Sequence, residues 1–223
     1  MDKQLLMDGV KKFLAGIFLI GLLLFLPAGT IHYYNGWLFC GVLFIPVLIM
    51  GVVLYLKAPE LLRKRLREKE EQAEQKSVVA LSGLMFLAGF ILAGLDFRFA
   101  WTQLPSWLVY GAAVAFLLGY AMFGEVMREN AYLSRTVEVQ ENQVVIDTGL
   151  YGVVRHPMYT ATVVMFLAMP LVLGSVISFA VFLVYPFLLV KRIRNEEQVL
   201  EDGLAGYTEY KQKVKYRLIP FIW

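Results

Sequence analysis

The sequence predicts an all-α fold, a polytopic membrane helix bundle in which four spans precede a C-terminal helical hairpin. First, 59% of the 223 residues are hydrophobic and 17% are charged, with a mean hydropathy of +0.62, which is too apolar for an ordinary soluble domain. Second, long runs at 13–56, 77–95, 99–124 and 157–190 contain no Asp, Glu, Lys or Arg. Third, the single cysteine, Cys40, lies inside an apolar run, so neither a disulfide framework nor a thiolate metal site can form.

The first charge-free run holds two predicted spans. Three lysines precede an uncharged segment from residue 13 to about residue 28, a pattern shared with signal peptides. A retained helix is favoured, because a second apolar segment, 37–56, follows at once. This second segment has the ~20 residues that a hydrocarbon core requires, and Pro46 predicts a kink within it.

A densely charged segment, 57–77, comes next and still spaces leucines along its length, so we expect a short helix at the membrane surface. Its acids nearly balance its bases and aromatic residues are missing, which argues against a nucleic-acid partner. The third and fourth spans are predicted at 78–95 and 106–127.

Residues 128–157 contain no apolar run long enough to span a membrane. Part of this segment, 136–146, alternates like a β-strand, and Asp147-Thr-Gly is a turn signal. We expect an irregular or short extended segment that lies at the surface.

The last apolar run, 158–190, is too long for one straight span and too short for two full ones. Pro170 and Gly174-Ser175 interrupt it, which predicts a helical hairpin that turns near residues 173–176. The remaining tail, 191–223, is polar and amphipathic. We therefore divide the chain into N-terminal transmembrane helices, 1–127, and a C-terminal core, 128–223.

The basic residues predict the orientation. With this number of crossings, 20 of the 21 Lys and Arg residues lie on one face and only Arg98 lies on the other. The positive-inside rule makes the crowded face cytoplasmic, so both chain termini are expected in the cytoplasm.

The charge-free spans also restrict the function. Ion-coupled pumps and carriers usually need ionisable groups at membrane depth, so transport is disfavoured. No second histidine lies near His156, so we expect no metal site, and no Gly-rich fingerprint follows a strand, so a dinucleotide domain is excluded. A non-enzymatic membrane scaffold remains open.

Polar chemistry concentrates between residues 149 and 159, where His156 precedes Pro157 and an apolar helix. A second polar group follows the hairpin, where Arg192 and Glu196 share one helical face. By spacing alone, Arg192 and Glu196 are an exposed ion pair, Glu196-Glu197 is a solvated face, and His156 is a hydrogen-bonded interface residue.

Three motifs together carry a family resemblance. They are Asp147-Thr-Gly-Leu-Tyr-Gly-Val-Val-Arg-His-Pro-Met-Tyr159, Arg192-Ile-Arg-Asn-Glu-Glu-Gln-Val-Leu200 and Gly206-Tyr-Thr-Glu-Tyr-Lys211. Their combination resembles the isoprenylcysteine carboxyl methyltransferase family from about Asn130 onward. The motifs are less specific for substrate, because related membrane methyltransferases that act on phospholipids share this core.

The resemblance implies a multi-span enzyme that uses S-adenosyl-L-methionine, enclosed by the cytoplasmic segment and the tail, with a lipid-like acceptor entering from the bilayer. It implies that Arg192 faces the acceptor carboxylate as the catalytic and substrate-binding residue. The residues implied to bind the cofactor are Gln140, Gln143, Val144, Val145, Ile146, Tyr151, His156, Pro157, Met158, Tyr159 and Glu196.

The function implied by this resemblance is carboxyl O-methylation of a prenylated cysteine or similar lipid-like acceptor. A carboxylate nucleophile is already charged, so alignment and removal of water can drive methyl transfer without a strong base. The alternatives are methylation of phospholipids or other lipids, for which Arg192 would have little use, and the scaffold. The family often has glycine where this chain has Ala161, which adds a methyl group where helix and cofactor approach. The compact size resembles prokaryotic members of the family, which implies a location in a prokaryotic inner membrane.

Overall fold

The computed structural model describes residues 2–66, 73–133 and 139–223, and all regular secondary structure in these ranges is helical. The all-α prediction is therefore confirmed. The elements are α1 (Lys3–Ala28), α2 (Tyr34–Lys57), α3 (Pro59–Leu66), α4 (Ala73–Phe99), α5 (Ser106–Glu129), the 3₁₀ turn η1 (Gly149–Gly152), α6 (Pro157–Val172), α7 (Val176–Phe182), α8 (Tyr185–Gly203) and α9 (Tyr207–Lys213).

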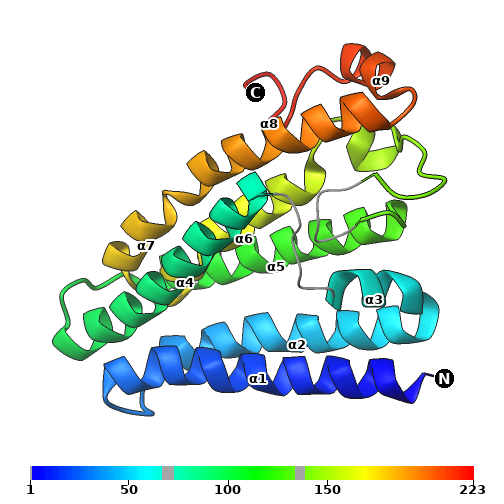
Figure 1. Ribbon diagram of the computed structural model, residues 1–223. Coiled ribbons are helices and arrows are strands. Elements are labelled where there is room, and N and C mark those ends of the chain that lie inside the picture. Colours follow the sequence, from blue (N-terminus) through cyan, green and yellow to red (C-terminus); the bar gives the residue numbers. More distant parts are fainter. Residues whose placement is uncertain (1, 67–72, 134–138) are drawn as a thin grey trace.

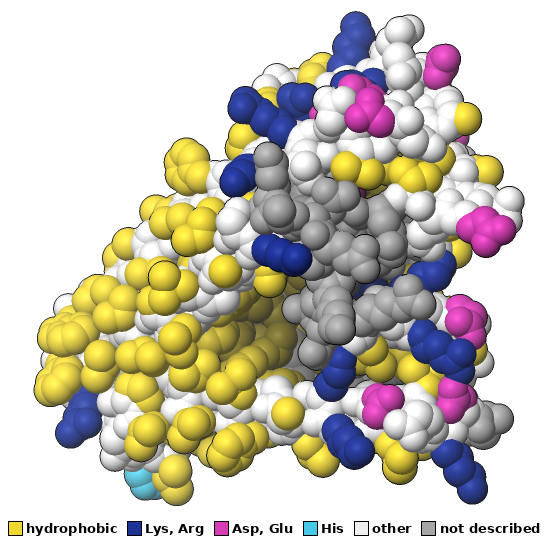
Figure 2. Space-filling view, viewed as in Figure 1, with side chains coloured by type: hydrophobic (Ala, Val, Ile, Leu, Met, Phe, Trp, Pro, Cys, Tyr) yellow, Lys and Arg dark blue, Asp and Glu magenta, His cyan; other side chains and the backbone are white. Residues whose placement is uncertain are grey.

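Five helical segments among the described residues are long and apolar enough to cross a membrane: α1, α2, α4 from Lys76, α5, and α7 with α8. Helix α6 is apolar but shorter. Helices suit this environment because they satisfy their backbone hydrogen bonds internally. Figure 2 shows hydrophobic side chains covering the middle of the bundle, with charged side chains gathered at one end. The protein is a multi-pass membrane protein.

The bundle runs between two unlike ends (Figure 1). Helices α1 and α2 lie side by side below the other long helices, with the N-terminus, α3 and α9 toward the right of the view. The connections 29–33, 100–105 and 173–175 lie toward the opposite end. Each apolar pass reverses the previous one, so the chain returns to the right-hand end for its polar segments.

The charged segment contains the predicted surface helix in part. Helix α3 buries Leu61 against Leu54, Tyr151 and their neighbours, while its three bases are exposed or partly buried. Residues 67–72 lie outside the described residues. Helix α4 begins at Ala73, and the part of it that could span a membrane begins at Lys76, close to the predicted start at residue 78.

The predicted hairpin is confirmed, with its turn at residues 173–175. Gly174 has φ of +79°, and Ser175 caps α7 by accepting a hydrogen bond from the Ser178 N–H at 3.0 Å. The second arm breaks between α7 and α8 and then continues to Gly203. The apolar run ends at residue 190, and a polar but amphipathic sequence extends the helix beyond it, as the predicted helical face of Arg192 and Glu196 requires.

The segment between α5 and α6 is irregular where it is described. Residues 136–138 of the predicted strand-like segment lie outside the described residues, and 139–148 contain no strand. A turn closes where the Gln143 N–H donates to the Gln140 carbonyl at 3.1 Å, with Asn142 at φ of +56°. The expectation of an irregular segment holds for these residues.

A buried carboxylate ties the connections at the left-hand end together. Asp96 is 1% exposed and accepts hydrogen bonds from the Thr102 N–H at 2.7 Å and from the Ser175 hydroxyl at 2.5 Å. The Tyr33 hydroxyl, also fully buried, donates to the Leu173 carbonyl at 2.6 Å. The hairpin turn is thereby held against α4 and the 100–105 connection.

Candidate functional site

The stretch 149–156 enters α6 through a tight turn. Gly149 has φ of +50°, and the Glu129 carboxylate occupies the space that a Cβ atom would need. Glu129 also accepts a hydrogen bond from the Leu150 N–H at 3.2 Å. The buried Tyr151 follows, and its hydroxyl accepts a hydrogen bond from the Asn130 side-chain amide at 2.9 Å. The turn is therefore fixed to the end of α5.

The C-terminal tail forms a second support for this stretch. The backbone N–H groups of Arg155 and His156 donate to the carbonyls of Tyr216 and Arg217, each at 2.9 Å. The Thr160 hydroxyl donates to the Leu218 carbonyl at 2.8 Å. These bonds join residues about sixty positions apart and hold the start of α6 beneath the tail.

Glu197 of α8 binds side chains from both the start of α6 and the C-terminal tail. Its carboxylate accepts hydrogen bonds from Arg155 Nε at 2.7 Å and from Arg217 Nε at 2.9 Å, and it lies 3.3 Å from His156 Nε2. Glu197 is 3% exposed, so the interpretation of Glu196-Glu197 as a solvated face was wrong for Glu197. The cause is its register, since Glu197 continues the buried face of α8.

Tyr159 links the two polar residues that face the site. Its hydroxyl donates to the Glu196 carboxylate and accepts from Arg192 Nε at 2.8 Å. The Arg192 guanidinium also lies over the Tyr159 ring, 5.8 Å from its centroid. The interpretation of Arg192 and Glu196 as an exposed ion pair is therefore corrected: both are partly buried, and a buried tyrosine joins them.

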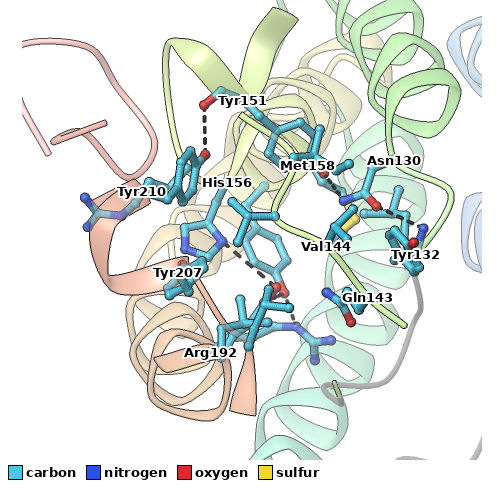
Figure 3. Close-up of a pocket in the computed structure, with 18 residues that line it drawn as sticks. Asn130, Tyr132, Gln143, Val144, Tyr151, His156, Met158, Arg192, Tyr207 and Tyr210 are labelled. Atoms are coloured by element: carbon cyan, nitrogen blue, oxygen red, sulfur yellow. Dashed lines mark hydrogen bonds and ion pairs between the residues drawn. The ribbon is translucent and has the colours of Figure 1, made fainter. Parts of the chain in front are cut away.

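These side chains surround a pocket at the polar end of the bundle (Figure 3). The pocket is formed by the residues that follow α5, the irregular segment, η1, the start of α6, α8 from Arg192 onward, and α9. The lining residues are Asn130, Tyr132, Leu133, Gln143, Val144, Val145, Ile146, Tyr151, Arg155, His156, Met158, Tyr159, Arg192, Glu196, Leu200, Leu204, Tyr207 and Tyr210.

Ten of the residues proposed from the sequence belong to this lining: Gln143, Val144, Val145, Ile146, Tyr151, His156, Met158, Tyr159, Arg192 and Glu196. Gln140 and Pro157 do not. The Gln140 side-chain amide donates to the Tyr132 carbonyl at 2.5 Å, which shapes the loop behind the pocket. Pro157 is the first residue of α6. Ala161 is fully buried in α6 and is not among the lining residues, so its methyl group bears on helix packing.

Sequence reasoning missed lining residues on both sides of the motifs. Asn130, Tyr132 and Leu133 directly follow α5, where nothing in the local pattern indicates a site. Leu204, Tyr207 and Tyr210 follow α8, and both tyrosines stood in the Gly-Tyr-x-x-Tyr motif without a role. Their three-residue spacing on a helix was a usable signal, because it places both rings on one face.

Burial determines the chemistry of the tyrosines in the wall. It raises the pKa values of Tyr151, Tyr207 and Tyr210 above their usual range, so their hydroxyls stay protonated. The Tyr210 hydroxyl donates to the Tyr151 carbonyl at 2.8 Å. At the edge, Lys213 bonds Asp147 at 2.6 Å and lowers the pKa of that carboxyl group. No group of three metal-ligating side chains occurs among the described residues.

The region 112–202, which contains most of this wall, matches the model of the isoprenylcysteine carboxyl methyltransferase (ICMT) family. The match covers 91 of the 223 residues, so the chain is similar to the ICMT family over this region. Leu204, Tyr207 and Tyr210 lie beyond the matched residues. The structure, and not the family model, places these three residues in the pocket wall.

Two individual proteins also resemble this chain. A delta(14)-sterol reductase from Mus musculus is 32% identical over 91 residues, which are 40% of this chain and 22% of that protein. The chain thus spans about a fifth of that relative's length. A solved structure of a eukaryotic intramembrane Ras methyltransferase ICMT superposes with a TM-score of 0.57 at 19% identity, covering 92% of this chain and 74% of the other. At this identity the likeness shows a shared ICMT-like fold.

Proposed function

We propose that this protein is an integral membrane methyltransferase that uses S-adenosyl-L-methionine to methylate a carboxylate on a prenylated-cysteine or similar lipid-like acceptor. The observation that carries the proposal is the pairing of Arg192 and Glu196 across Tyr159 in one pocket. One side chain suits a carboxylate, and the other suits an ammonium group. The similarity of residues 112–202 to the ICMT family model supports the same reaction class.

The chemistry of the lining fits this cofactor. The Glu196 carboxylate would hold the amino group, and Met158, Val144 and Leu200 offer apolar contacts for a nucleoside or thioether. The backbone of 143–146 is irregular, so its peptide groups are not committed to a helix. When bound, the cofactor supplies a methyl group on a sulfonium, which moves to a carboxylate oxygen and leaves the thioether S-adenosylhomocysteine.

The residues of the chain would align the acceptor carboxylate with the methyl group of the cofactor. The Arg192 guanidinium is held by its hydrogen bond and ring contact with Tyr159, so it presents a fixed direction toward a carboxylate. A carboxylate held in line needs no general base, which leaves His156 as part of the wall. Exclusion of water by the aromatic wall would raise the reactivity of that carboxylate.

The surface supports a lipid-like acceptor. Figure 2 shows a hollow lined by hydrophobic side chains between the α1–α2 pair and the helices above it. Arg65 in α3 lies over the Phe123 ring at 5.2 Å and places a guanidinium nitrogen 4.0 Å from the Met158 sulfur. Basic and apolar groups thus meet beside the pocket, as an acceptor with a lipid chain and a carboxylate requires.

The test is incubation of the purified protein with methyl-labelled cofactor and an S-farnesylcysteine derivative. We expect label that base releases, as from an ester. Label that resists base and appears on phospholipid headgroups would instead show lipid amine methylation. Failure to bind S-adenosylhomocysteine in calorimetry would contradict methyl transfer altogether.

The likeness to a sterol reductase favours a second candidate, reduction of a sterol-like double bond on the same scaffold. Thermal unfolding with S-adenosylhomocysteine and with a reduced nicotinamide dinucleotide separates the two candidates. A methyltransferase is stabilised by the first ligand and a nicotinamide-dependent reductase by the second.

A further inference from the structure

The Tyr207 hydroxyl is a buried polar group in the pocket wall with no hydrogen-bond partner, the one such side-chain atom among the described residues. Tyr207 is 4% exposed, so bulk water does not supply the missing hydrogen-bond partner. We infer that the Tyr207 hydroxyl is a cofactor-binding group, which donates a hydrogen bond to an acceptor atom of the S-adenosyl ligand. This inference rests on the proposed function.

The neighbouring tyrosine shows that the missing partner is specific to Tyr207. Tyr210 lies one turn along α9, with ring centroids 5.7 Å apart, and its hydroxyl donates to the Tyr151 carbonyl at 2.8 Å. The two side chains share a helix, a degree of burial and a pocket. The Tyr210 hydroxyl holds two parts of the pocket wall together, whereas the Tyr207 hydroxyl is available to a ligand.

The backbone keeps Tyr207 in this position. Gly206 has φ of +84° at the start of α9, and the Tyr207 N–H donates to the Leu204 carbonyl at 3.2 Å. Tyr207 also packs in a small cluster with Leu204, Tyr210 and Val214. Turning the ring toward solvent would break this cluster, so the hydroxyl cannot easily find water.

The type of ligand atom follows from protonation. Burial, then the nearby Glu197 and Glu196, raise the pKa of Tyr207, so the phenol keeps its proton near neutral pH. A protonated phenol with its hydrogen uncommitted is a donor. The ligand must therefore present an acceptor there, while Glu196 accepts from ligand donors on the adjoining wall.

The experiment compares Tyr207→Phe with the matched control Tyr210→Phe. Calorimetry with S-adenosylhomocysteine and thermal unfolding of the ligand-free protein are measured for both variants and the original chain. We expect Tyr207→Phe to weaken binding roughly 3- to 10-fold, because one hydrogen bond to the ligand is lost. The unfolding temperature of the ligand-free variant should stay level or rise, since an uncompensated buried hydroxyl is removed. Tyr210→Phe should lower that temperature, because it leaves the Tyr151 carbonyl without its donor.

The outcomes distinguish this inference from the proposed function. If the original chain binds S-adenosylhomocysteine and Tyr207→Phe binds it equally well, the inference is overturned while the methyltransferase proposal stands. If ligand-free Tyr207→Phe unfolds as early as Tyr210→Phe, the hydroxyl already has a partner in the free protein, and the inference is again overturned. Absence of binding by the original chain overturns both.

Discussion

Adjacent glutamates on α8 have different environments. Glu196 lines the pocket and accepts a hydrogen bond from the Tyr159 hydroxyl. Glu197 does not line the pocket and forms ion pairs with Arg155 and Arg217. Removing the charge at each position should therefore have different consequences. Charge at Glu197 supports the fold, and we propose that charge at Glu196 serves the ligand.

Glu197→Gln should destabilise the protein by about 3–5 kcal/mol, because two guanidinium groups would lose their buried counter-charge. Glu196→Gln should leave the unfolding temperature nearly unchanged and weaken S-adenosylhomocysteine binding roughly tenfold, or about 1.4 kcal/mol. Thermal unfolding in detergent and calorimetry measure the two effects. Equal loss of stability in both variants would argue against separate roles.

Arg192→Ala should lower the turnover of a prenylated-cysteine acceptor on the order of 100-fold, because the proposed carboxylate partner is lost. Binding of S-adenosylhomocysteine should change by less than about threefold, since Arg192 is proposed to face the acceptor. Arg192→Lys is the control: it keeps the charge but loses the planar fork, so it should recover turnover only in part. Matching losses of binding and turnover would place Arg192 in the cofactor site or the fold.

At the level of elements, close packing of α5 against α6 sets the position of the site. A Cβ atom at Gly119 would lie 2.9 Å from Met165 Cγ and 3.2 Å from the Ala161 carbonyl oxygen. Helices approach this closely in membranes where small residues line the contact. Because α6 begins at Pro157, this contact also positions His156 and Tyr159.

Gly119→Ala should accordingly destabilise the protein by about 1–3 kcal/mol through overpacking. It should also weaken S-adenosylhomocysteine binding, because α6 carries part of the wall. Gly111→Ala, in the same helix, is a matched control, since nothing lies within 4 Å of a Cβ atom there. Unfolding temperatures of the two variants give the comparison, and equal values would contradict the packing argument.

The elements also show how far local patterns reach. Gly174-Ser175 between apolar runs predicted the hairpin turn correctly, because glycine accommodates the positive φ and serine caps the next helix. Hydropathy falls at Lys191 while α8 continues to Gly203, so hydropathy alone does not locate the end of this helix. Beyond the apolar part, Ile193 and Glu197 continue the buried face that Tyr185 and Leu189 begin.

At the scale of the whole molecule, the passes of the chain return its polar segments to one end of the bundle (Figure 1). The positive-inside rule predicts that this end is cytoplasmic. The division of the chain at residues 127 and 128 stays a prediction, as does a prokaryotic inner-membrane location.

Reporter fusions in a bacterial host test the orientation. Green fluorescent protein after Trp223 should fluoresce, and alkaline phosphatase inserted between Gln103 and Leu104 should be active. The reason is that the basic segments anchor the first site in the cytoplasm, while the second lies in the opposite connection. An active phosphatase fused after Trp223 would reverse the proposed topology.

The sequence alone determined the class of fold and the region of the site. Charge-free runs can only be membrane or core helices at this length, and the stretch 149–159 was the polar interruption among them. These properties are local, so they can be read from neighbouring residues.

Only the tertiary structure decided which of two adjacent glutamates is buried, how the tail supports Arg155, and which tyrosine of α9 lacks a partner. Each outcome depends on contacts between residues tens of positions apart. Residue type and helical spacing restrict such contacts, but the partners are chosen only when the helices pack.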